Sequence, residues 1–525
     1  MICPKCHAEY FEKIKQCGDC IVDLVDASSI DLPIPEMTWV PLKPIHGSIY
    51  AEMIIEILNK EEIPHYAKND WSSAALNTGG TELVNNIVRI FVPENFEEQA
   101  AHLFENMKMV RTIKGTHDIL PAQSGDWQDL ETQIHKTANL HGYDEIRTPI
   151  IEDAALFNRG VGEETDIVSK EMYSWIDKDK STISLRPELT APVVRAYVQH
   201  NLGGQSLLQR LYYIGPSFRR ERPQKGRQRQ FHQFGVEAIG SDNPEQDAEV
   251  ISIGWNILNN FGINELELNI SSIGSDECRT NYKQELINYL KPFIPQLSEV
   301  SQHRLKHNPL RILDTKNKDE IKIIESAPKI ENFYTKEDET YFLTVQQYLD
   351  DLEIPYKINP LLVRGLDYYT QTTFEISSKK IGAQDALLGG GRYDGLIKSL
   401  GGKDVPAVGF AAGMERILIA TDSRKRTDKQ VACIYIVCTD LSALGPLQQI
   451  AKNLRELDIK VILETLRRSM KAQMREANKK NANYAIIVGE QEAIDKTVQL
   501  KNLNEGKQDT INQGELIAYF KSLTF

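Results

Sequence analysis

The sequence predicts a multidomain protein that combines α+β and α/β domains, and three observations lead to this prediction. Two segments with strand chemistry, 211–218 and 231–240, flank a short basic loop and therefore indicate an antiparallel hairpin. Strand-like and helix-like segments alternate from residue 430 onwards, which is typical of an α/β domain with a mainly parallel sheet. The first 20 residues hold four of the seven cysteines, which indicates a small metal-binding module at this end.

Length and composition are those of an ordinary globular protein. The chain has 525 residues, which at ~150 residues per domain suggests three or four domains. It is 41% hydrophobic and 26% charged, it has no run of ~20 apolar residues that could span a membrane, and its first residues lack the apolar core of a signal peptide. We therefore expect a cytoplasmic protein without membrane association. The formal net charge of −13 counts against a general coat on nucleic acid, although it permits a local basic surface.

CPKC at 3–6 and CGDC at 17–20 form a pair of CxxC motifs. This spacing suits a tetrahedral Zn²⁺ ion bound by four thiolates, two from each motif. The predicted ligands, in a structural zinc ribbon over residues 1–25, are Cys3, Cys6, Cys17 and Cys20. Four reduced thiols and a redox-active pair remain as alternative interpretations. Among the other cysteines, Cys433 and Cys438 lie in an apolar run, as buried free thiols often do.

Residues 38–108 are predicted to form a small α+β domain of unknown role, after a linker at 26–37 that contains turn formers and two prolines. Apolar residues at helical spacing indicate two helices, and β-rich runs indicate three strands. The expected strands are 38–42, 65–70 and 85–93, and the expected helices are 50–63 and 94–107. The region resembles a small family of signal-transducing domains that are linked to zinc ribbons. It contains no catalytic cluster.

Residues 110–422 form the longest predicted region. Its expected elements, in order, are a helix at 127–140, a strand-like run with a proline at 145–153, a strand and a helix within 183–200, the hairpin, a mainly helical segment at 274–350 and strand chemistry at 359–376. A charged connector at 423–429 follows. Beyond it, the expected strands are 431–440, 460–464 and 482–489, and the expected helices are 442–457 and 468–480.

The second strand of the hairpin carries a candidate ligand site. A strand has a side-chain period of two, so Phe231, Gln233, Gly235 and Glu237 share one face. An amide and a carboxylate beside an empty spot at Gly235 would suit a small polar ligand, with Glu237 accepting from an amino group or a ring N–H. A cross-strand pair on a solvated face is the alternative.

The loop between the two strands is strongly basic. Its cationic residues are Arg219, Arg220, Arg222, Lys225, Arg227 and Arg229. Planar guanidinium groups bind phosphate oxygens in bidentate fashion, so Arg219 and Arg227 could clamp a polyphosphate. The sequence contains no GxxxxGK[ST] loop, so any nucleotide is held in another way. A solvated basic loop is the alternative.

Several motifs, taken in order, resemble those of histidyl-tRNA synthetases, a family of class II aminoacyl-tRNA synthetases. They are KGTHDILP at 114–121, RTPIIED at 147–153 (motif 1), RPELTAPVVRA at 186–196, the basic hairpin (motif 2), LVRGLDYYT at 362–370, GGGRYDGL at 389–396 and AVGFAAGMERI at 407–417 (motif 3). Alone, GGGRYDG could be a tight turn, LDYYT core packing and AGMERI an ordinary helix start. Their joint order covers about four-fifths of the chain and favours the resemblance.

The resemblance implies a class II antiparallel-sheet catalytic core at 110–422 with a helical insertion at 274–350, an anticodon-binding α/β domain at 430–525, and a homodimer formed through motif 1. It implies ATP-dependent ligation of L-histidine to tRNA(His) through a histidyl-adenylate, with Mg²⁺ accompanying ATP. The residues implied for histidine are Glu188, Thr190, Gln233, Glu237, Tyr368 and Tyr369. Those implied for ATP are Arg219 at the α-phosphate, Glu221 at adenine, and Arg227 and Arg416 at the outer phosphates. Arg364, with Arg219, would be catalytic.

Some points remain open in the sequence. A histidine-binding regulatory paralogue that does not charge tRNA is the competing interpretation, although such proteins typically lack the C-terminal module and have lost phosphate-binding arginines.

The basic helix at 466–480 could contact tRNA phosphates or be an ordinary solvated face. Its cations are Arg467, Arg468, Lys471, Arg475, Lys479 and Lys480. Leu189, Arg220 and Gln228 differ from the residues common in bacterial members, which leaves the tRNA-end contacts open. Met107 and Met109 make an internal start conceivable.

Overall fold

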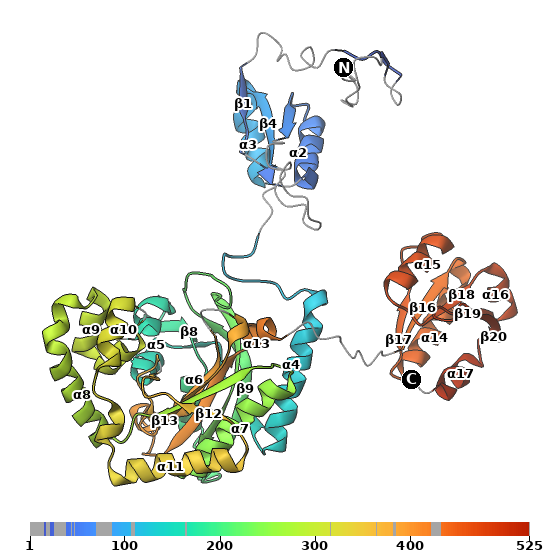
Figure 1. Cartoon of the computed structure of the whole chain (residues 1–525). Helices are drawn as coiled ribbons and strands as arrows, with labels where there is room; N and C mark the ends of the chain where they lie inside the picture. The colour runs from blue at the N-terminus through green and yellow to red at the C-terminus, as the bar shows by residue number, and fades with distance from the viewer. Residues whose placement is uncertain are drawn as a thin grey trace. The chain divides into compact units, whose positions relative to one another are not determined.

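A computed structural model describes most of the chain, and the contacts divide it into two compact units, 1–119 and 120–525 (Figure 1). The described residues are 15–16, 21–25, 38–43, 45–46, 48–69, 87–106, 111–162, 165–315, 317–363, 365–381, 385–421 and 432–523. The four cysteines of the predicted zinc ribbon, the linker at 26–37, the connector at 423–429 and Arg364 lie outside them.

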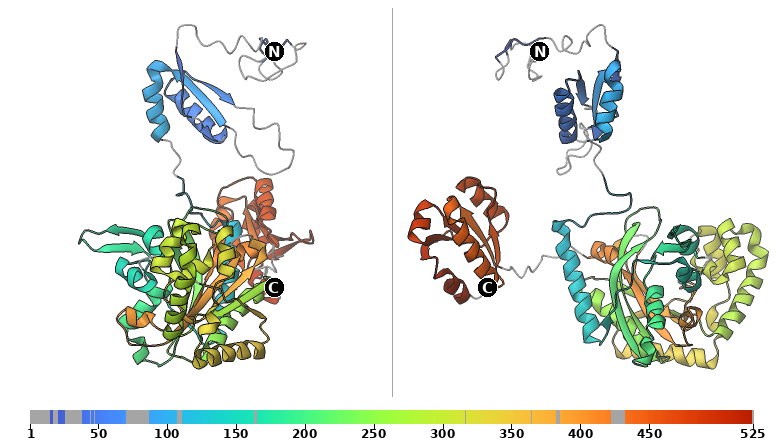
Figure 2. Two further views of the ribbon diagram at one scale, coloured as in Figure 1. Left: turned by 60° about the vertical axis from the view of Figure 1, so that its left-hand side comes forward. Right: turned by 180° about the vertical axis from the view of Figure 1, so that it is seen from behind.

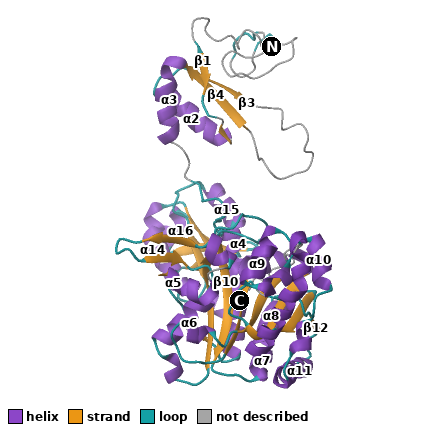
Figure 3. Cartoon of the chain, turned by 90° about the vertical axis from the view of Figure 1, so that its left-hand side faces the viewer, coloured by secondary structure: helices purple, strands orange, loops and turns teal. Residues whose placement is uncertain are grey.

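In the first unit, the described residues between 38 and 106 form a four-stranded antiparallel sheet with two helices (Figure 3). The strands are β1 (Trp39–Pro41), β2 (Ile45–His46), β3 (Tyr66–Asn69) and β4 (Ile87–Pro93), and the helices are α2 (Ser48–Lys60) and α3 (Glu97–Asn106). Val88, Ile90 and Val92 alternate along β4 and are buried in one apolar core with residues of both helices. The expected strands and helices are therefore present, and β2 is an addition.

The second unit is built on an eight-stranded sheet in the order β12-β11-β13-β14-β15-β10-β9-β5. The strands are β5 (Asp144–Glu145), β9 (Gln209–Phe218), β10 (Gln230–Ile239), β11 (Leu266–Ser272), β12 (Tyr356–Ile358), β13 (Thr370–Ser378), β14 (Ala386–Arg392) and β15 (Ala407–Gly413). All neighbouring pairs are antiparallel except β5 with β9 and β11 with β12. The predicted hairpin is confirmed, with Phe218 opposite Gln230 at its tip.

Helices cover this sheet. Its main core includes residues of α4 (Pro121–Leu140), α7 (Pro244–Asn260) and α11 (Lys336–Asp351). Elsewhere in the unit, α6 (Thr190–Gln199) packs against α12 (Leu396–Ser399), and α13 (Met414–Ala420) follows β15. A second, three-stranded sheet in the order β6-β8-β7 lies beside them, and its hairpin extends outward in Figure 2. Its strands are β6 (Ile151–Asp153), β7 (Tyr173–Ile176) and β8 (Thr182–Leu185).

Three predicted segments differ from the structure in detail. The strand-like run at 145–153 is split between β5 and β6, because Pro149 lacks an N–H for a continuous ladder. In 359–376, only residues from Thr370 onwards are a strand, and the preceding loop forms a wall of the site described below. The segment 274–350 is helical as expected, with α8 (Asp276–Leu290), α9 (Glu299–His307) and α10 (Lys318–Glu325) around a core of their own, whereas α11 packs into the main core.

The C-terminal module confirms the predicted alternation of strands and helices. β17 (Lys460–Leu463), β16 (Cys433–Cys438) and β18 (Tyr484–Val488) are parallel, and β19 (Thr497–Asn502) and β20 (Gln508–Asn512) extend the sheet in antiparallel fashion. Its helices are α14 (Leu444–Arg455), α15 (Met470–Lys479), α16 (Glu490–Asp495) and α17 (Leu516–Ser522). Cys433 and Cys438 are buried free thiols, as expected. No helix in the described ranges is long and apolar enough to cross a membrane.

Candidate active site

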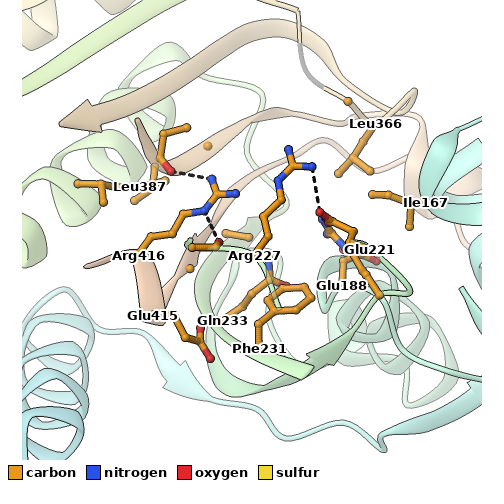
Figure 4. Close-up of a pocket in the computed structure, with 18 of the residues that line it drawn as sticks. Ile167, Glu188, Glu221, Arg227, Phe231, Gln233, Leu366, Leu387, Glu415 and Arg416 are labelled. Atoms are coloured by element: carbon orange, nitrogen blue, oxygen red, sulfur yellow. Dashed lines mark hydrogen bonds and ion pairs between the residues drawn. The ribbon is translucent and has the colours of Figure 1, made fainter. Parts of the chain in front are cut away.

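The hairpin, the loop before β13 and the ends of β14 and β15 enclose a cavity of about 230 Å³ (Figure 4). The predicted site residues that line it are Glu188, Thr190, Arg219, Glu221, Arg227, Gln233, Tyr368, Tyr369 and Arg416. These residues come from segments spread over more than 200 positions of the sequence, so the fold gathers them. Gln228 and Glu415 also line the cavity, and sequence reasoning did not assign them to it.

Glu188 lies at the start of α6. Its two carboxylate oxygens accept hydrogen bonds from the backbone N–H groups of Thr190 and Ala191, at 2.7 and 2.8 Å. These donors are otherwise unsatisfied in the first turn of a helix, and the helix dipole favours an anion there. Burial raises the pKa of the Glu188 carboxyl, while the backbone donors act in the opposite direction. The side chain is therefore held in one orientation at the cavity wall.

Glu237 lies behind this wall and is completely buried. Its carboxylate accepts hydrogen bonds from the hydroxyl groups of Thr190, at 2.8 Å, and of Tyr393. Burial raises the pKa of Glu237 to about 8. Glu237 does not line the cavity and is connected to it through Thr190, which does. Sequence reasoning missed Tyr393, although it belongs to the GGGRYDGL motif.

Two glycines of the sheet shape this polar cluster. Gly409 pairs with Glu237 across β15 and β10, and a Cβ atom at this position would overlap the carboxylate. Gly235 pairs with Tyr213, and a Cβ atom there would overlap the tyrosine hydroxyl and the carbonyl of Phe410. The space expected to be empty at Gly235 is therefore filled by protein. That part of the prediction is wrong, because the sequence does not reveal which side chain lies across the strand.

Gln233 and the tyrosines complete this side of the cavity. The Gln233 side-chain oxygen accepts a hydrogen bond from the hydroxyl of Ser217 at 3.1 Å, which sets the orientation of the amide. The Tyr368 ring lies 4.8 Å from Tyr369 and 5.7 Å from Tyr393, measured between ring centroids. These rings form an aromatic wall next to the carboxylates, which suits a small cationic or N–H-bearing ring.

The guanidinium groups lie at the other side. Arg219 donates from Nε to the Pro187 carbonyl at 2.9 Å and lies 5.2 Å above the Phe231 ring. Both contacts fix its direction, so this arginine is not part of a solvated loop. Glu221 lies 4.0 Å from Arg219 and 2.9 Å from Arg227 (Figure 4).

Arg416 holds the tip of the hairpin against the sheet. It donates from Nε to the Gly226 carbonyl at 3.0 Å and from Nη1 to the Ala386 carbonyl at 2.9 Å (Figure 4). Burial and the nearby Arg227 lower the pKa of Arg416, yet a guanidinium stays charged at physiological pH. Three guanidinium groups thus meet at one cavity, which suits a polyphosphate. Arg364 lies outside the described residues, so its predicted role remains a prediction.

The arrangement combines a pole of carboxylates and tyrosines with a pole of guanidinium groups. Among the described residues that line the cavity there is no serine, cysteine or lysine. Thr190, Glu188 and Glu221 could act as nucleophiles in principle, but each of them is already engaged in a hydrogen bond or an ion pair. The geometry favours direct reaction between two bound molecules, one carrying a basic ring or amine and the other a polyphosphate.

Comparison with known proteins agrees with this geometry. The model of the histidyl-tRNA synthetase family matches residues 115–417, and the model of an anticodon binding domain matches residues 430–523. A histidine–tRNA ligase of Crocosphaera subtropica is 46% identical over 411 residues, which are 78% of this chain and 95% of the relative. A histidine–tRNA ligase of Halothermothrix orenii is 45% identical over 416 residues, 79% of this chain and 99% of the relative.

A solved structure shows the same relationship. The crystal structure of apo histidyl-tRNA synthetase from S. aureus aligns with a TM-score of 0.67 at 36% identity, and covers 79% of this chain and 100% of that one. The family match begins at residue 115, after the first unit's described sheet and helices. By sequence, by fold and by the order of its motifs, the chain belongs to the histidyl-tRNA synthetase family.

Proposed function

We infer that this protein is a histidine–tRNA ligase, which joins L-histidine to tRNA(His) with ATP. The observation that carries this conclusion is the single cavity in which Glu188, Thr190 and the tyrosine wall face three guanidinium groups. Family membership and the names of the close relatives agree with it. The C-terminal anticodon-binding module completes the ligase architecture.

We assign histidine to the pole of carboxylates and tyrosines. Glu188, Thr190 and Gln233 would contact the amino group and the ring, and Tyr368 and Tyr369 would cover the imidazole. Glu237 would act from behind Thr190, and its ionised form, favoured by the hydroxyl groups of Thr190 and Tyr393, would orient the Thr190 side chain. A site that hydrogen-bonds a substrate N–H rejects analogues without that group, since its own polar atoms are then left unpaired.

We assign ATP, which enters as its Mg²⁺ complex, to the guanidinium pole. Arg219 would contact the α-phosphate, Glu221 the adenine, and Arg227 and Arg416 the outer phosphates. A carboxylate oxygen of histidine attacks the α-phosphorus, the bond to the bridging oxygen breaks, and pyrophosphate leaves with its electron pair. The protein aligns two anions and neutralises the charge that develops on the α-phosphoryl oxygens. Arg219, together with the predicted Arg364, would provide that charge.

In the second step, a hydroxyl of the 3′-terminal ribose of tRNA attacks the carbonyl carbon of the adenylate, and AMP leaves. The C-terminal module would hold the anticodon region. Two cations of the basic segment 466–480 already form ion pairs within this module: Arg468 lies 2.7 Å from Glu464, and Lys480 lies 3.9 Å from Glu476. Phosphate contacts would therefore fall to its other cations, Arg467, Lys471, Arg475 and Lys479.

We also propose a homodimer formed through motif 1. Ile150, Ile151, Trp175 and Ile176 are 41–73% exposed around the three-stranded sheet. Large apolar side chains that cluster on a surface commonly mark a protein interface. Sedimentation of the full chain at micromolar concentration is expected to give twice the mass of 59.6 kDa.

The remaining assignments concern location and the N-terminal region. We propose that the protein acts in the cytoplasm, that Cys3, Cys6, Cys17 and Cys20 hold a structural Zn²⁺, and that residues 38–108 form a separate domain appended to a catalytic core at 110–422. The anticodon-binding domain is assigned to 430–525.

ATP–pyrophosphate exchange with each standard amino acid tests the function. Exchange that depends on histidine alone is expected. Histidine binding without any exchange would instead favour the regulatory paralogue, and a tRNA(His) charging assay with the same protein would then give no product. Exchange with a different amino acid would contradict the assignment of the pocket.

A further inference from the structure

Arg186 is a buried cation outside the set of residues assigned to the substrates. Only 3% of the surface of Arg186 is exposed to solvent. Its guanidinium donates to the carbonyls of Pro216 at 2.8 Å, Thr148 at 2.8 Å and Pro149 at 3.2 Å, and to the Thr148 hydroxyl at 3.1 Å. All of these acceptors are neutral, and no carboxylate in the described ranges forms an ion pair with it. A buried charge is costly unless it is well hydrogen-bonded, so this arrangement needs an explanation.

The backbone of Arg186 joins the same two segments as its side chain. Its N–H donates to the Ile150 carbonyl at 2.9 Å, and its carbonyl accepts from the Phe218 N–H at 3.0 Å. One residue therefore connects the motif 1 segment, 148–150, with the end of β9 at 216–218. The planar fork of arginine can reach several acceptors at once, which a lysine cannot do.

The next two residues contact the active site. The carbonyl of Pro187 accepts from Nε of Arg219, and the carboxylate of Glu188 caps α6 at the cavity wall. Because Pro187 and Glu188 directly follow Arg186 in the chain, a shift of Arg186 would move the partners of both. Arg219 lies on the ATP side and Glu188 on the histidine side, so one anchor serves both halves of the cavity.

A glycine of β9 makes room for this anchor. Gly215 pairs with Gln233, and a Cβ atom at Gly215 would lie 2.5 Å from Nη2 of Arg186. Real Cβ contacts are not this short, so the guanidinium occupies the space that a larger residue would need. The position of the Arg186 guanidinium therefore depends on Gly215, and a substitution at either residue would displace it.

We propose that Arg186 is a positioning residue of the ligation reaction, which fixes Pro187 and Glu188 on the motif 1 backbone and thereby aims Arg219 at ATP and the Glu188 carboxylate at histidine. This inference rests on the proposed function. Arg186 acts through these two neighbours and does not line the cavity. It also links the active site to Ile150, whose carbonyl accepts from the Arg186 N–H, and to the adjacent Ile151, and both isoleucine side chains are exposed.

The test compares Arg186→Lys and Gly215→Ala with Arg195→Lys in the full-length protein. Arg195 lies on α6 nearby but pairs with Glu152, so it is the matched control. The kcat and the KM values for ATP and histidine are measured by pyrophosphate exchange, with active sites counted by a burst of adenylate. Both test variants are expected to raise KM and to lower kcat/KM by about 10- to 100-fold, the effect of misplacing a positioned group by about 1 Å.

A merely structural role has a different signature. Loss of folded protein lowers the number of active sites and leaves KM and the kcat per site unchanged, and that result for both variants would overturn the proposal. Histidine affinity by calorimetry gives a second readout that needs no turnover. If the wild-type protein shows no exchange, the proposed function fails, but weaker histidine binding by Gly215→Ala and Arg186→Lys, relative to Arg195→Lys, still supports the positioning role, and equal affinity refutes it.

Discussion

Replacing Tyr393 with phenylalanine isolates one hydrogen bond beneath the proposed histidine pocket. The hydroxyl of Tyr393 donates to the buried carboxylate of Glu237, whose pKa burial raises to about 8. This donor favours the ionised form, so its removal raises that pKa further. A hydrogen bond to a charged group is worth about 1.5–3 kcal/mol, or roughly 10- to 150-fold in affinity. Histidine binding that depends on ionised Glu237 is therefore expected to weaken by about that factor near neutral pH.

The sign of the pH dependence follows from the same reasoning. Below the pKa, most of the protein carries a protonated Glu237, and each further unit of pKa costs tenfold in apparent affinity. Well above both pKa values, the carboxyl is ionised in either protein and the difference narrows. Calorimetric titration of histidine from pH 6.5 to pH 9.5 measures this. If the variant loses the same histidine affinity at every pH, the role given to ionisation of Glu237 is refuted. If it loses no histidine affinity at any pH, the role given to the Tyr393–Glu237 hydrogen bond is refuted.

The C-terminal module offers a matched control for this variant. The hydroxyl of Tyr435 donates to the buried Glu464 at 2.6 Å, which reproduces the tyrosine–carboxylate pair away from the catalytic cavity. Tyr435→Phe is expected to lower the stability of the module and to leave histidine affinity unchanged. Parallel loss of histidine binding in both variants would indicate general damage instead of a local effect.

Three further predictions concern other parts of the chain. Arg364→Ala should greatly slow adenylate formation in a folded protein, and unchanged pyrophosphate exchange would remove Arg364 from the mechanism. The Arg468 guanidinium lowers the pKa of Glu464 to about 2, so this pair stabilises the folded module above about pH 4.5 and the stabilisation is lost as the pH falls towards 2. Thermal melts of the wild-type protein should show this loss between those pH values, and Glu464→Gln should show a smaller loss. Metal analysis of residues 1–30, purified under reducing conditions, should find about one zinc per chain; less than about half an equivalent would contradict the zinc ribbon.

The sequence was most informative where a local pattern decides the structure. Alternation along 231–240 placed Gln233 and Glu237 on one face, and the alternation of apolar segments after residue 430 predicted the parallel sheet. The order of the motifs assigned residues as distant as Glu188 and Arg416 to one site, and both line the cavity. These features depend on side-chain period and chain order, which can be read directly from the residues.

Other features of the site depend on contacts between distant segments, which local sequence patterns do not predict. The position of Tyr213 over Gly235 and the clearance at Gly409 for Glu237 depend on strand register across the sheet. Glu237 was expected to contact the ligand beside Gln233, but it lies behind Thr190, because α6 packs over that end of the strand. The partners of Arg186 come from segments 30 to 38 residues away and have no sequence signature.

The appended domain at 38–106 packs its apolar residues among themselves, with Ile54, Leu58, Ile90 and Val92 in one core. A module with a hydrophobic core of its own can in principle fold by itself. The family match starts only at residue 115. In evolutionary terms, the whole module could therefore be gained or lost in one gene fusion or deletion, without compensating changes in the enzyme that carries it.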